Sequence, residues 1–201
     1  MKDYELFFQK RPDIAFLYDY IPANSRVLDL GCADGFLLHA LKENKNCSVQ
    51  GIDLSQDMVM TCISKGVSVI QNDLNSGLNF CGEKSFDYVV MGQTFQQVKD
   101  PQELIREMLR VGRESFVSMY NIAYMPMRLQ IAFKGRMPYS KHLPYEWYNT
   151  PNIHLGSVDD FSDMCRKEGF GIKAISSLNQ GVLAKLFPNS WAELALFILE
   201  D

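Results

Sequence analysis

A run of small residues near the start of the chain has the spacing of a ligand-binding turn. Residues 29–36 read DLGCADGF, and the small side chains at positions 31, 33 and 35 allow a sharp turn from strand to helix and close approach of a ligand to the backbone. A dinucleotide-binding loop, G-x-G-x-x-G, would need its third glycine at position 36. Phe36 stands there and would obstruct contact with a pyrophosphate. The run therefore disfavours a NAD site and suits a ligand without phosphates.

Two carboxylates follow predicted strands farther along the chain. Asp53 ends the second strand, where a carboxylate can accept hydrogen bonds from both hydroxyls of a ribose. Asp73 follows the third strand and can accept a hydrogen bond from an exocyclic amine such as that of adenine. Either acid alone is equally well explained as a solvated loop residue. The turn and the two acids, taken in this order, favour a nucleoside-containing ligand over a similar fold whose site is empty or lost.

The elements that must position these residues alternate between apolar runs and amphipathic segments. Five nearly apolar runs predict strands that are covered on both faces, as in a parallel sheet: 26–31, 49–53, 67–71, 86–91 and 116–120. Two later runs, 171–178 and 194–199, predict further strands. We expect one domain over residues 1–201, an α/β Rossmann-like sheet of about seven mostly parallel strands with helices on both faces.

Helix signals lie between these strands. Three predicted helices begin after an N-cap residue and end at a glycine: Ser55 to Gly66, Asp100 to Gly112 and Ser157 to Gly169. The first of them is expected to turn one apolar face inward, made of Met58, Val59, Cys62 and Ile63.

Residues 121–155 break this alternation and form an insertion between the fifth and sixth strands. The central part of the insertion interleaves aromatic residues with cations: Tyr139, Tyr145, Trp147 and Tyr148 with Arg136 and Lys141. Aromatic residues together with Arg are typical of the cores of protein–protein interfaces. A lid that folds over the protein's own ligand explains the same composition. Both interpretations, lid and docking segment, stay open at this point.

The composition excludes several classes of protein. The 20 Lys and Arg residues against 24 Asp and Glu give a net charge of −4, which lacks the positive field expected of a nucleic-acid-binding protein. The longest stretch without a charged side chain, residues 115–127, is too short to span a bilayer. The N-terminus lacks the apolar region of a secretion signal. We expect a cytoplasmic protein that binds neither nucleic acid nor membranes.

The cysteines and histidines show no metal-ligand spacing. The five cysteines are scattered and none are spaced C-x-x-C: Cys32, Cys47, Cys62, Cys81 and Cys165. This pattern predicts buried thiols, with neither disulfides nor a metal site.

The ordered motifs resemble those of class I S-adenosylmethionine-dependent methyltransferases. In that superfamily the glycine-rich turn packs on the methionine half of the cofactor, the second-strand acid holds the ribose, and the third-strand acid lies beside the adenine. The resemblance implies that Asp29 lies near the cofactor's ammonium group. It also implies that S-adenosylmethionine or S-adenosylhomocysteine contacts Asp29, Gly31, Ala33, Gly35, Asp53, Leu54, Asp73, Leu74 and Gln93. Most members have glycine in place of Ala33, and alanine resists a positive φ, so we expect a reduced affinity.

Several further stretches resemble one family within that superfamily, the methionine biosynthesis protein W (MetW) family. They are RPD at 11–13, QNDL at 71–74, KSFDYVV at 84–90, QTFQQV at 93–98, REMLRVGR at 106–113, GRMP at 135–138 and LPYEWYNTPNIHL at 143–155. Residues 135–155 are the most specific part, because generic methyltransferases lack them. The family acts in methionine biosynthesis beside a homoserine O-acyltransferase of the MetX type, so the resemblance implies that partner, with residues 135–155 as the docking segment.

The loop after the fourth strand offers little chemistry for methyl transfer. A transfer needs a nucleophile in line with the sulfonium carbon and often a general base. The loop instead holds Gln93, Thr94, Gln96 and Gln97, and amides do not take protons near neutral pH. The insertion contributes two candidate catalytic residues, His154 and Tyr148. Three interpretations stay open: an accessory protein of the acyltransferase, an independent small-molecule methyltransferase, and a Rossmann-like module without a cofactor.

Overall fold

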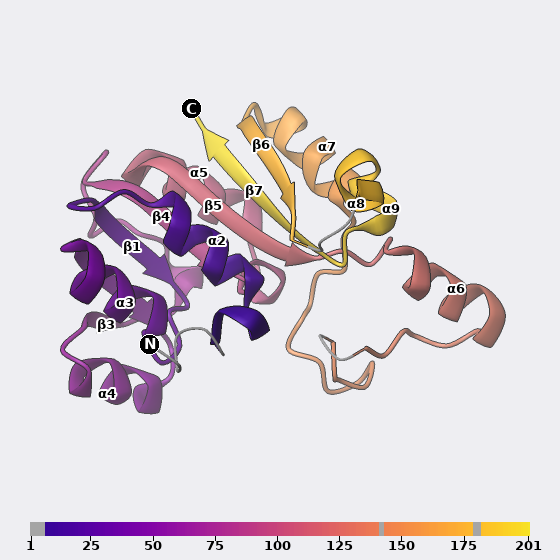
Figure 1. Ribbon diagram of the computed structural model, residues 1–201, viewed down its shortest axis with the longest axis horizontal. Helices are drawn as coiled ribbons and strands as arrows, with labels where there is room; N and C mark the ends of the chain where they lie inside the picture. Colours follow the sequence, from indigo (N-terminus) through magenta and orange to yellow (C-terminus); the bar gives the residue numbers. More distant parts are fainter. Residues whose placement is uncertain (1–6, 141–142, 179–181) are drawn as a thin grey trace.

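The computed structural model describes residues 7–140, 143–178 and 182–201, and a seven-stranded sheet runs through it (Figure 1). The strand order is β3-β2-β1-β4-β5-β7-β6, in which β7 lies antiparallel between β5 and β6 while β1 to β5 pair in parallel. The predicted mostly parallel α/β sheet is therefore confirmed. The strands are β1 (Arg26–Leu30), β2 (Ser48–Asp53), β3 (Ser68–Gln71), β4 (Phe86–Gly92), β5 (Gly112–Tyr120), β6 (Gly171–Ser177) and β7 (Leu194–Glu200).

Helices alternate with these strands along the chain. They are α2 (Pro12–Tyr20), α3 (Phe36–Lys45), α4 (Gln56–Ser64), α5 (Pro101–Val111), α6 (Met125–Lys134), α7 (Val158–Glu168), α8 (Val182–Leu186) and α9 (Pro188–Trp191). Short 3₁₀ turns span Leu74–Ser76 and Phe95–Gln97.

The helices form an apolar layer on each face of the sheet. One layer packs α5 and α7 against Leu28 and Phe197, and the other packs α2, α3 and α4 against Val27 and Phe116. Val27 and Leu28 are neighbours in β1 and face opposite layers, because successive side chains of a strand alternate between faces. The sheet is thus covered on both sides, as its nearly apolar strands predict.

The predicted helix starts are confirmed by cap geometry. Ser55, Asp100 and Ser157 each accept a hydrogen bond from a backbone N–H of the first turn that follows. The predicted inward face of α4 is wrong at Ile63, which is 54% exposed, whereas Val59 and Cys62 are buried. Because α4 packs on β3 at the edge of the sheet, no further strand extends the surface beneath it, and the helix buries only a narrow stripe.

The fifth strand begins at Gly112, earlier than its apolar run predicts. Gly112 both ends α5 and begins β5, and a Cβ atom at this position would lie 2.6 Å from Val89 Cγ2. Glycine therefore lets the end of the helix lie directly against β4. The apolar pattern does not extend to this start, because the charged residues Arg113 and Glu114 interrupt it.

The predicted insertion follows β5 and carries α6, which stands beside the body of the molecule and away from α3 and α4 (Figure 1). Helices α2, α8 and α9 have no counterpart among the predicted elements. Of the helices within the described ranges, none is long and apolar enough to cross a membrane.

All five cysteines are buried and free, which confirms the prediction of buried thiols. Cys32 and Cys62 lie beneath the small-residue turn with their Sγ atoms 3.9 Å apart. Burial raises the pKa of both thiols, which disfavours the thiolate form.

Candidate functional site

A cavity of about 640 Å³ opens where the parallel strands β1, β2 and β4 end. Ligands of open α/β sheets commonly bind at this edge, because the loops that leave the carboxyl ends of the strands meet there. Seven of the nine predicted cofactor-binding residues line the cavity: Gly31, Ala33, Asp53, Leu54, Asp73, Leu74 and Gln93. The other two, Asp29 and Gly35, support the turn from behind and are not part of the lining.

The turn after β1 holds three residues with positive φ within five positions of the chain. Gly31 has φ +74° and Gly35 has φ +70°. A Cβ atom on Gly31 would lie 2.4 Å from Thr94 Oγ1, and one on Gly35 would lie 2.8 Å from Cys62 Sγ. Ala33 has φ +48°, a conformation that costs an L-residue about 1–2 kcal/mol. The alanine predicted to resist this conformation therefore adopts it.

Asp53 holds the strained alanine in place. Its Oδ2 accepts a hydrogen bond from the Ala33 N–H at 2.8 Å, and its Oδ1 accepts one from the Ser55 N–H at 2.9 Å. Each carboxylate oxygen has a second lone pair. Asp53 can therefore shape the turn and still accept hydrogen bonds from two hydroxyls of a ligand in the cavity.

Asp73 occupies the neighbouring corner of the cavity. Its Oδ1 accepts hydrogen bonds from the backbone N–H of Asn75 at 2.9 Å and from the side-chain amide of the same residue at 2.7 Å. Leu54 and Met58 add apolar surface to the lining of the same cavity. The arrangement suits a flat, polar-edged ring system flanked by a diol.

Asp29 lies at the end of β1, buried behind the turn. Burial raises the pKa of its carboxyl to about 7; the Arg11 guanidinium opposes this rise, and the Asp13 and Asp53 carboxylates add to it. A cationic group bound beside Asp29 would favour its ionised form. The ammonium-binding role that the resemblance implies stays a prediction, because Asp29 lies behind the residues that line the cavity.

A polar network forms the floor of the cavity and was not predicted from the sequence. Asp13 is fully buried and accepts hydrogen bonds from Arg11 Nη2 at 2.8 Å, Gln93 Nε2 at 3.1 Å and Ser118 Oγ at 3.0 Å. The Tyr120 hydroxyl donates to Gln93 Oε1 at 2.6 Å. Arg11, Gln93 and Tyr120 also line the cavity. Arg11 and Asp13 stand in the RPD stretch, but only the fold brings residues 93, 118 and 120 beside them.

Burial raises the pKa of Tyr120 to about 12; the Arg11 guanidinium opposes this rise, and the Asp13 carboxylate adds to it. A phenol with this pKa stays protonated at neutral pH. Tyr120 is therefore a hydrogen-bond donor in this cavity rather than a general base.

The two candidate catalytic residues of the insertion lie outside this cavity. Neither Tyr148 nor His154 is part of the lining, and Tyr148 is 70% exposed. Within the described ranges, the buried Nε2 atom of His154 has no hydrogen-bond partner. No group of His, Cys, Asp and Glu side chains there could hold a metal ion.

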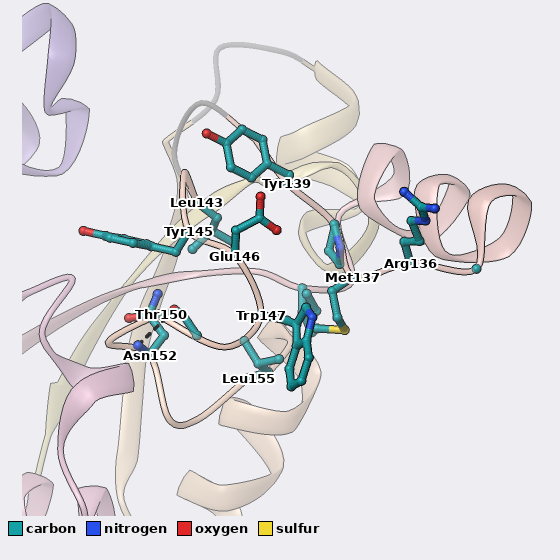
Figure 2. Close-up of a pocket in the computed structure, with 13 residues that line it drawn as sticks. Arg136, Met137, Tyr139, Leu143, Tyr145, Glu146, Trp147, Thr150, Asn152 and Leu155 are labelled. Carbon is teal, nitrogen blue, oxygen red and sulfur yellow. Dashed lines mark hydrogen bonds between the residues drawn. The ribbon is translucent and has the colours of Figure 1, made fainter.

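A second cavity of about 550 Å³ lies within the insertion (Figure 2). Met137, Trp147 and Leu155 lie together on one side of it, whereas the ring of Tyr145 points away from them (Figure 2). Trp147 is 73% exposed, and Met137 and Leu155 are about half exposed. Lys141, which the sequence places among these aromatic residues, lies outside the described residues. The insertion therefore presents an open apolar surface.

The insertion also forms one wall of the first cavity, through Pro144, Tyr145, Pro151 and Asn152. Tyr145 and Asn152 line both cavities. The segment for which the composition left a lid and a docking surface as alternatives thus contributes to the lining of both cavities.

Comparison with known proteins places this architecture in a family. The family model "Methionine biosynthesis protein MetW" matches residues 11–199. A protein of Rhodopirellula baltica, "Bifunctional methionine biosynthesis protein MetXA/MetW", is 35% identical over 157 residues; the match covers 74% of this chain but only 25% of that protein. The chain thus spans about a quarter of the length of this relative.

Solved structures show the same fold at low sequence identity. An S-adenosylmethionine-dependent methyltransferase of Mesorhizobium loti is 18% identical with a TM-score of 0.67, and the match covers 94% of this chain and 96% of that one. A complex of the Haloferax volcanii Trm112 methyltransferase activator with a putative methyltransferase contains a chain with a TM-score of 0.68 at 17% identity, covering 98% and 92% of the two chains. The sheet order, the cavity at its edge and the match over residues 11–199 agree: this chain belongs to the MetW family.

Proposed function

We propose that this protein binds S-adenosylmethionine or S-adenosylhomocysteine and supports a homoserine O-acyltransferase of the MetX type in methionine biosynthesis. The observation that carries the partner is the Rhodopirellula baltica relative, whose name joins MetXA and MetW in one chain. Two activities joined in one polypeptide in one organism commonly act together in another. The fold and the cavity support the ligand, and the open apolar surface of the insertion supports the docking.

In the proposed cofactor complex, Asp53 binds the ribose hydroxyls and Asp73 lies beside the adenine. The turn around Gly31 and Ala33 packs on the methionine half, whose ammonium group lies near Asp29. Arg11 faces the same cavity, and within the described part of the chain its guanidinium donates to Asp13 through Nε and Nη2. The outer edge of the guanidinium is positioned to receive the carboxylate of the same ligand.

The loop after β4 supports a binding role over catalysis. Gln93 uses both ends of its amide within the protein, toward Asp13 and Tyr120. Gln96 is buried, and its amide bonds to backbone groups of Tyr120 and His154. Neither side chain can take a proton from an acceptor. The cofactor therefore acts as a ligand in this proposal.

An independent small-molecule methyltransferase is the second candidate. It is favoured by the likeness to the S-adenosylmethionine-dependent methyltransferase of Mesorhizobium loti, which extends over nearly the whole of both chains. It requires production of S-adenosylhomocysteine from S-adenosylmethionine in the presence of some metabolite. Such turnover, abolished by Asp53→Ala, would favour this candidate over the accessory role.

Calorimetry with S-adenosylmethionine and with S-adenosylhomocysteine tests the ligand. Asp53→Ala should weaken binding at least about tenfold, because it removes hydrogen bonds to a charged group, each of which contributes about 1.5–3 kcal/mol. Asp19→Ala, which removes an exposed carboxylate outside the cavity, is the matched control. Absence of heat with either ligand would leave a Rossmann-like module without a cofactor.

Docking is tested with the purified acyltransferase. Trp147→Ala and Tyr148→Ala should each weaken its binding by about 2 kcal/mol or more if these side chains are anchors of the interface. The free energy of unfolding of each variant of this protein should change by no more than about 0.5 kcal/mol, because both side chains are mostly exposed. Phe80→Ala removes a half-exposed aromatic residue outside both cavities and serves as the control. Equal acyltransferase activity with and without this protein would refute the proposed role.

A further inference from the structure

The segment between the two cavities is held by one buried residue, through its backbone carbonyl and its side chain. Gln96 is 2% exposed and lies in the 3₁₀ turn Phe95–Gln97, directly after β4. Its backbone carbonyl oxygen accepts hydrogen bonds from the backbone N–H groups of Ile153 at 2.8 Å and His154 at 3.1 Å. Its side-chain Nε2 donates to the carbonyl oxygen of His154 at 3.1 Å. Three hydrogen bonds thus join this one residue to the end of the insertion.

The same side chain also fixes the end of β5. Gln96 Oε1 accepts a hydrogen bond from the Tyr120 N–H at 3.0 Å, and Nε2 donates to the Tyr120 carbonyl at 3.3 Å. Gln93, Thr94 and Gln97 on either side of it line the cofactor cavity. A displacement of this turn by a ligand would therefore act on Ile153 and His154 through these hydrogen bonds.

A second connection runs through the wall that the cavities share. Tyr145 and Asn152 line both cavities, and Asn152 is buried. The Asn152 N–H donates to Thr150 Oγ1 at 3.1 Å, which closes a tight turn at the base of the aromatic surface (Figure 2). A ligand in the first cavity would contact Tyr145 and Asn152, which line the second cavity together with Trp147.

We infer that the cofactor cavity regulates the docking surface: a bound nucleoside ligand orders residues 144–154 and thereby tightens the binding of the acyltransferase. This inference rests on the proposed function and assigns regulation to its site. A partner that docks on a segment already ordered loses less conformational freedom on binding, so the two affinities rise together. Thermodynamic linkage requires that the partner tighten ligand binding by the same factor. Gln96 is the positioning residue that connects the two sites.

The first experiment needs no partner. Hydrogen exchange at the Ile153 and His154 amides is followed with and without S-adenosylhomocysteine, a ligand that has no methyl group to transfer. Both amides should exchange at least about fivefold more slowly in the complex, in line with coupling factors of about 5 to 150. Gln96→Met keeps the backbone carbonyl that accepts from both amides but removes the side-chain hydrogen bonds to His154 and Tyr120, so it should reduce the slowing while the ligand still binds. Gln102→Met, an exposed change of the same type on α5, should leave it intact.

The second experiment measures the dissociation constant of the acyltransferase with and without saturating S-adenosylhomocysteine, and that of the ligand with and without the acyltransferase. Both ratios should equal the same factor of about 5 or more in the wild-type protein and approach 1 in Gln96→Met. If Gln96→Met does not fold, Tyr145→Ala, at a partly exposed position in the shared wall, replaces it.

The outcomes separate this inference from the proposed function. Ligand binding with unchanged exchange and unchanged docking overturns the inference alone. A coupling that survives in both variants overturns the role of the Gln96 connection. Failure of the ligand to bind overturns the cofactor proposal and the inference with it. Slowed exchange in a protein that does not bind the acyltransferase upholds the connection and refutes the partner.

Discussion

The floor of the first cavity and the surface of the insertion differ in how completely this chain buries and pairs their side chains. On the floor, Asp13 has no exposed surface and receives hydrogen bonds from three side chains, one of them the charged Arg11. In the insertion, α6 buries only Met127, and the aromatic residues that follow it are largely exposed. The floor is complete within this chain, whereas the insertion carries apolar surface that this chain leaves open. Substitutions should therefore act on folding in the first region and on association in the second.

The largest expected effect tests the floor. Arg11→Met removes the charged partner of a fully buried carboxylate and should lower the free energy of unfolding by about 3–5 kcal/mol. Arg136→Met, at an exposed position of the insertion, should change it by no more than about 0.5 kcal/mol. Urea unfolding of both variants measures the contrast. Similar losses in the two variants would erase the distinction between the regions.

A pair of glycines gives the next effect. Gly31→Ala adds a methyl group 2.4 Å from Thr94 Oγ1 at φ +74°, so strain of about 1–2 kcal/mol and overpacking of about 1–3 kcal/mol should both lower stability. Gly135→Ala meets no atom within 4 Å and has φ +59°, so only the strain applies. Thermal unfolding should therefore show the larger loss for Gly31→Ala, and ligand binding should be lost in that variant alone. A larger loss for Gly135→Ala would mean that the turn after β1 relaxes readily.

A further contrast is a pH dependence of stability that arises from one carboxyl behind the turn. Asp29 has a pKa of about 7 in the folded protein, raised above its usual value by burial, so the folded state holds a proton that the unfolded state has released. This contribution to stability is complete below about pH 4 and is lost as the pH rises to about 7, by at most about 1.4 kcal/mol per pH unit. Asp29→Asn should remove this part of the dependence of the unfolding free energy on pH, measured by urea unfolding at a series of pH values. An unchanged slope would show that other groups control the pH dependence.

Local signals predicted most of the framework. The apolar runs located all seven strands, and Ser55, Asp100 and Ser157 located three helix starts, because strand patterns and caps depend on residues close in sequence. The start of β5 was missed where Arg113 and Glu114 interrupt the apolar pattern. Ile63 was misplaced because its burial depends on where the sheet ends, which the helix sequence does not show.

The candidate site was predictable to the extent that it follows strand ends. Gly31, Asp53 and Asp73 follow β1, β2 and β3, so the parallel sheet alone brings them to one cavity. The network of Arg11 and Asp13 with the ends of β4 and β5 spans residues far apart in sequence, and no local pattern marks it. The role of Gln96 was hidden for the same reason: an amide in a loop does not show that it will be buried.

The burial of every native thiol has a practical consequence. Covalent labelling with maleimide reagents requires an accessible thiolate, and the burial that raises the pKa of Cys165 to about 12 disfavours this form. A cysteine introduced by Tyr148→Cys, at a position that is 70% exposed, would then be the preferred target among the described residues. One fluorophore or spin label can therefore be attached to the insertion without first removing the five native cysteines, and its signal would report on that segment alone.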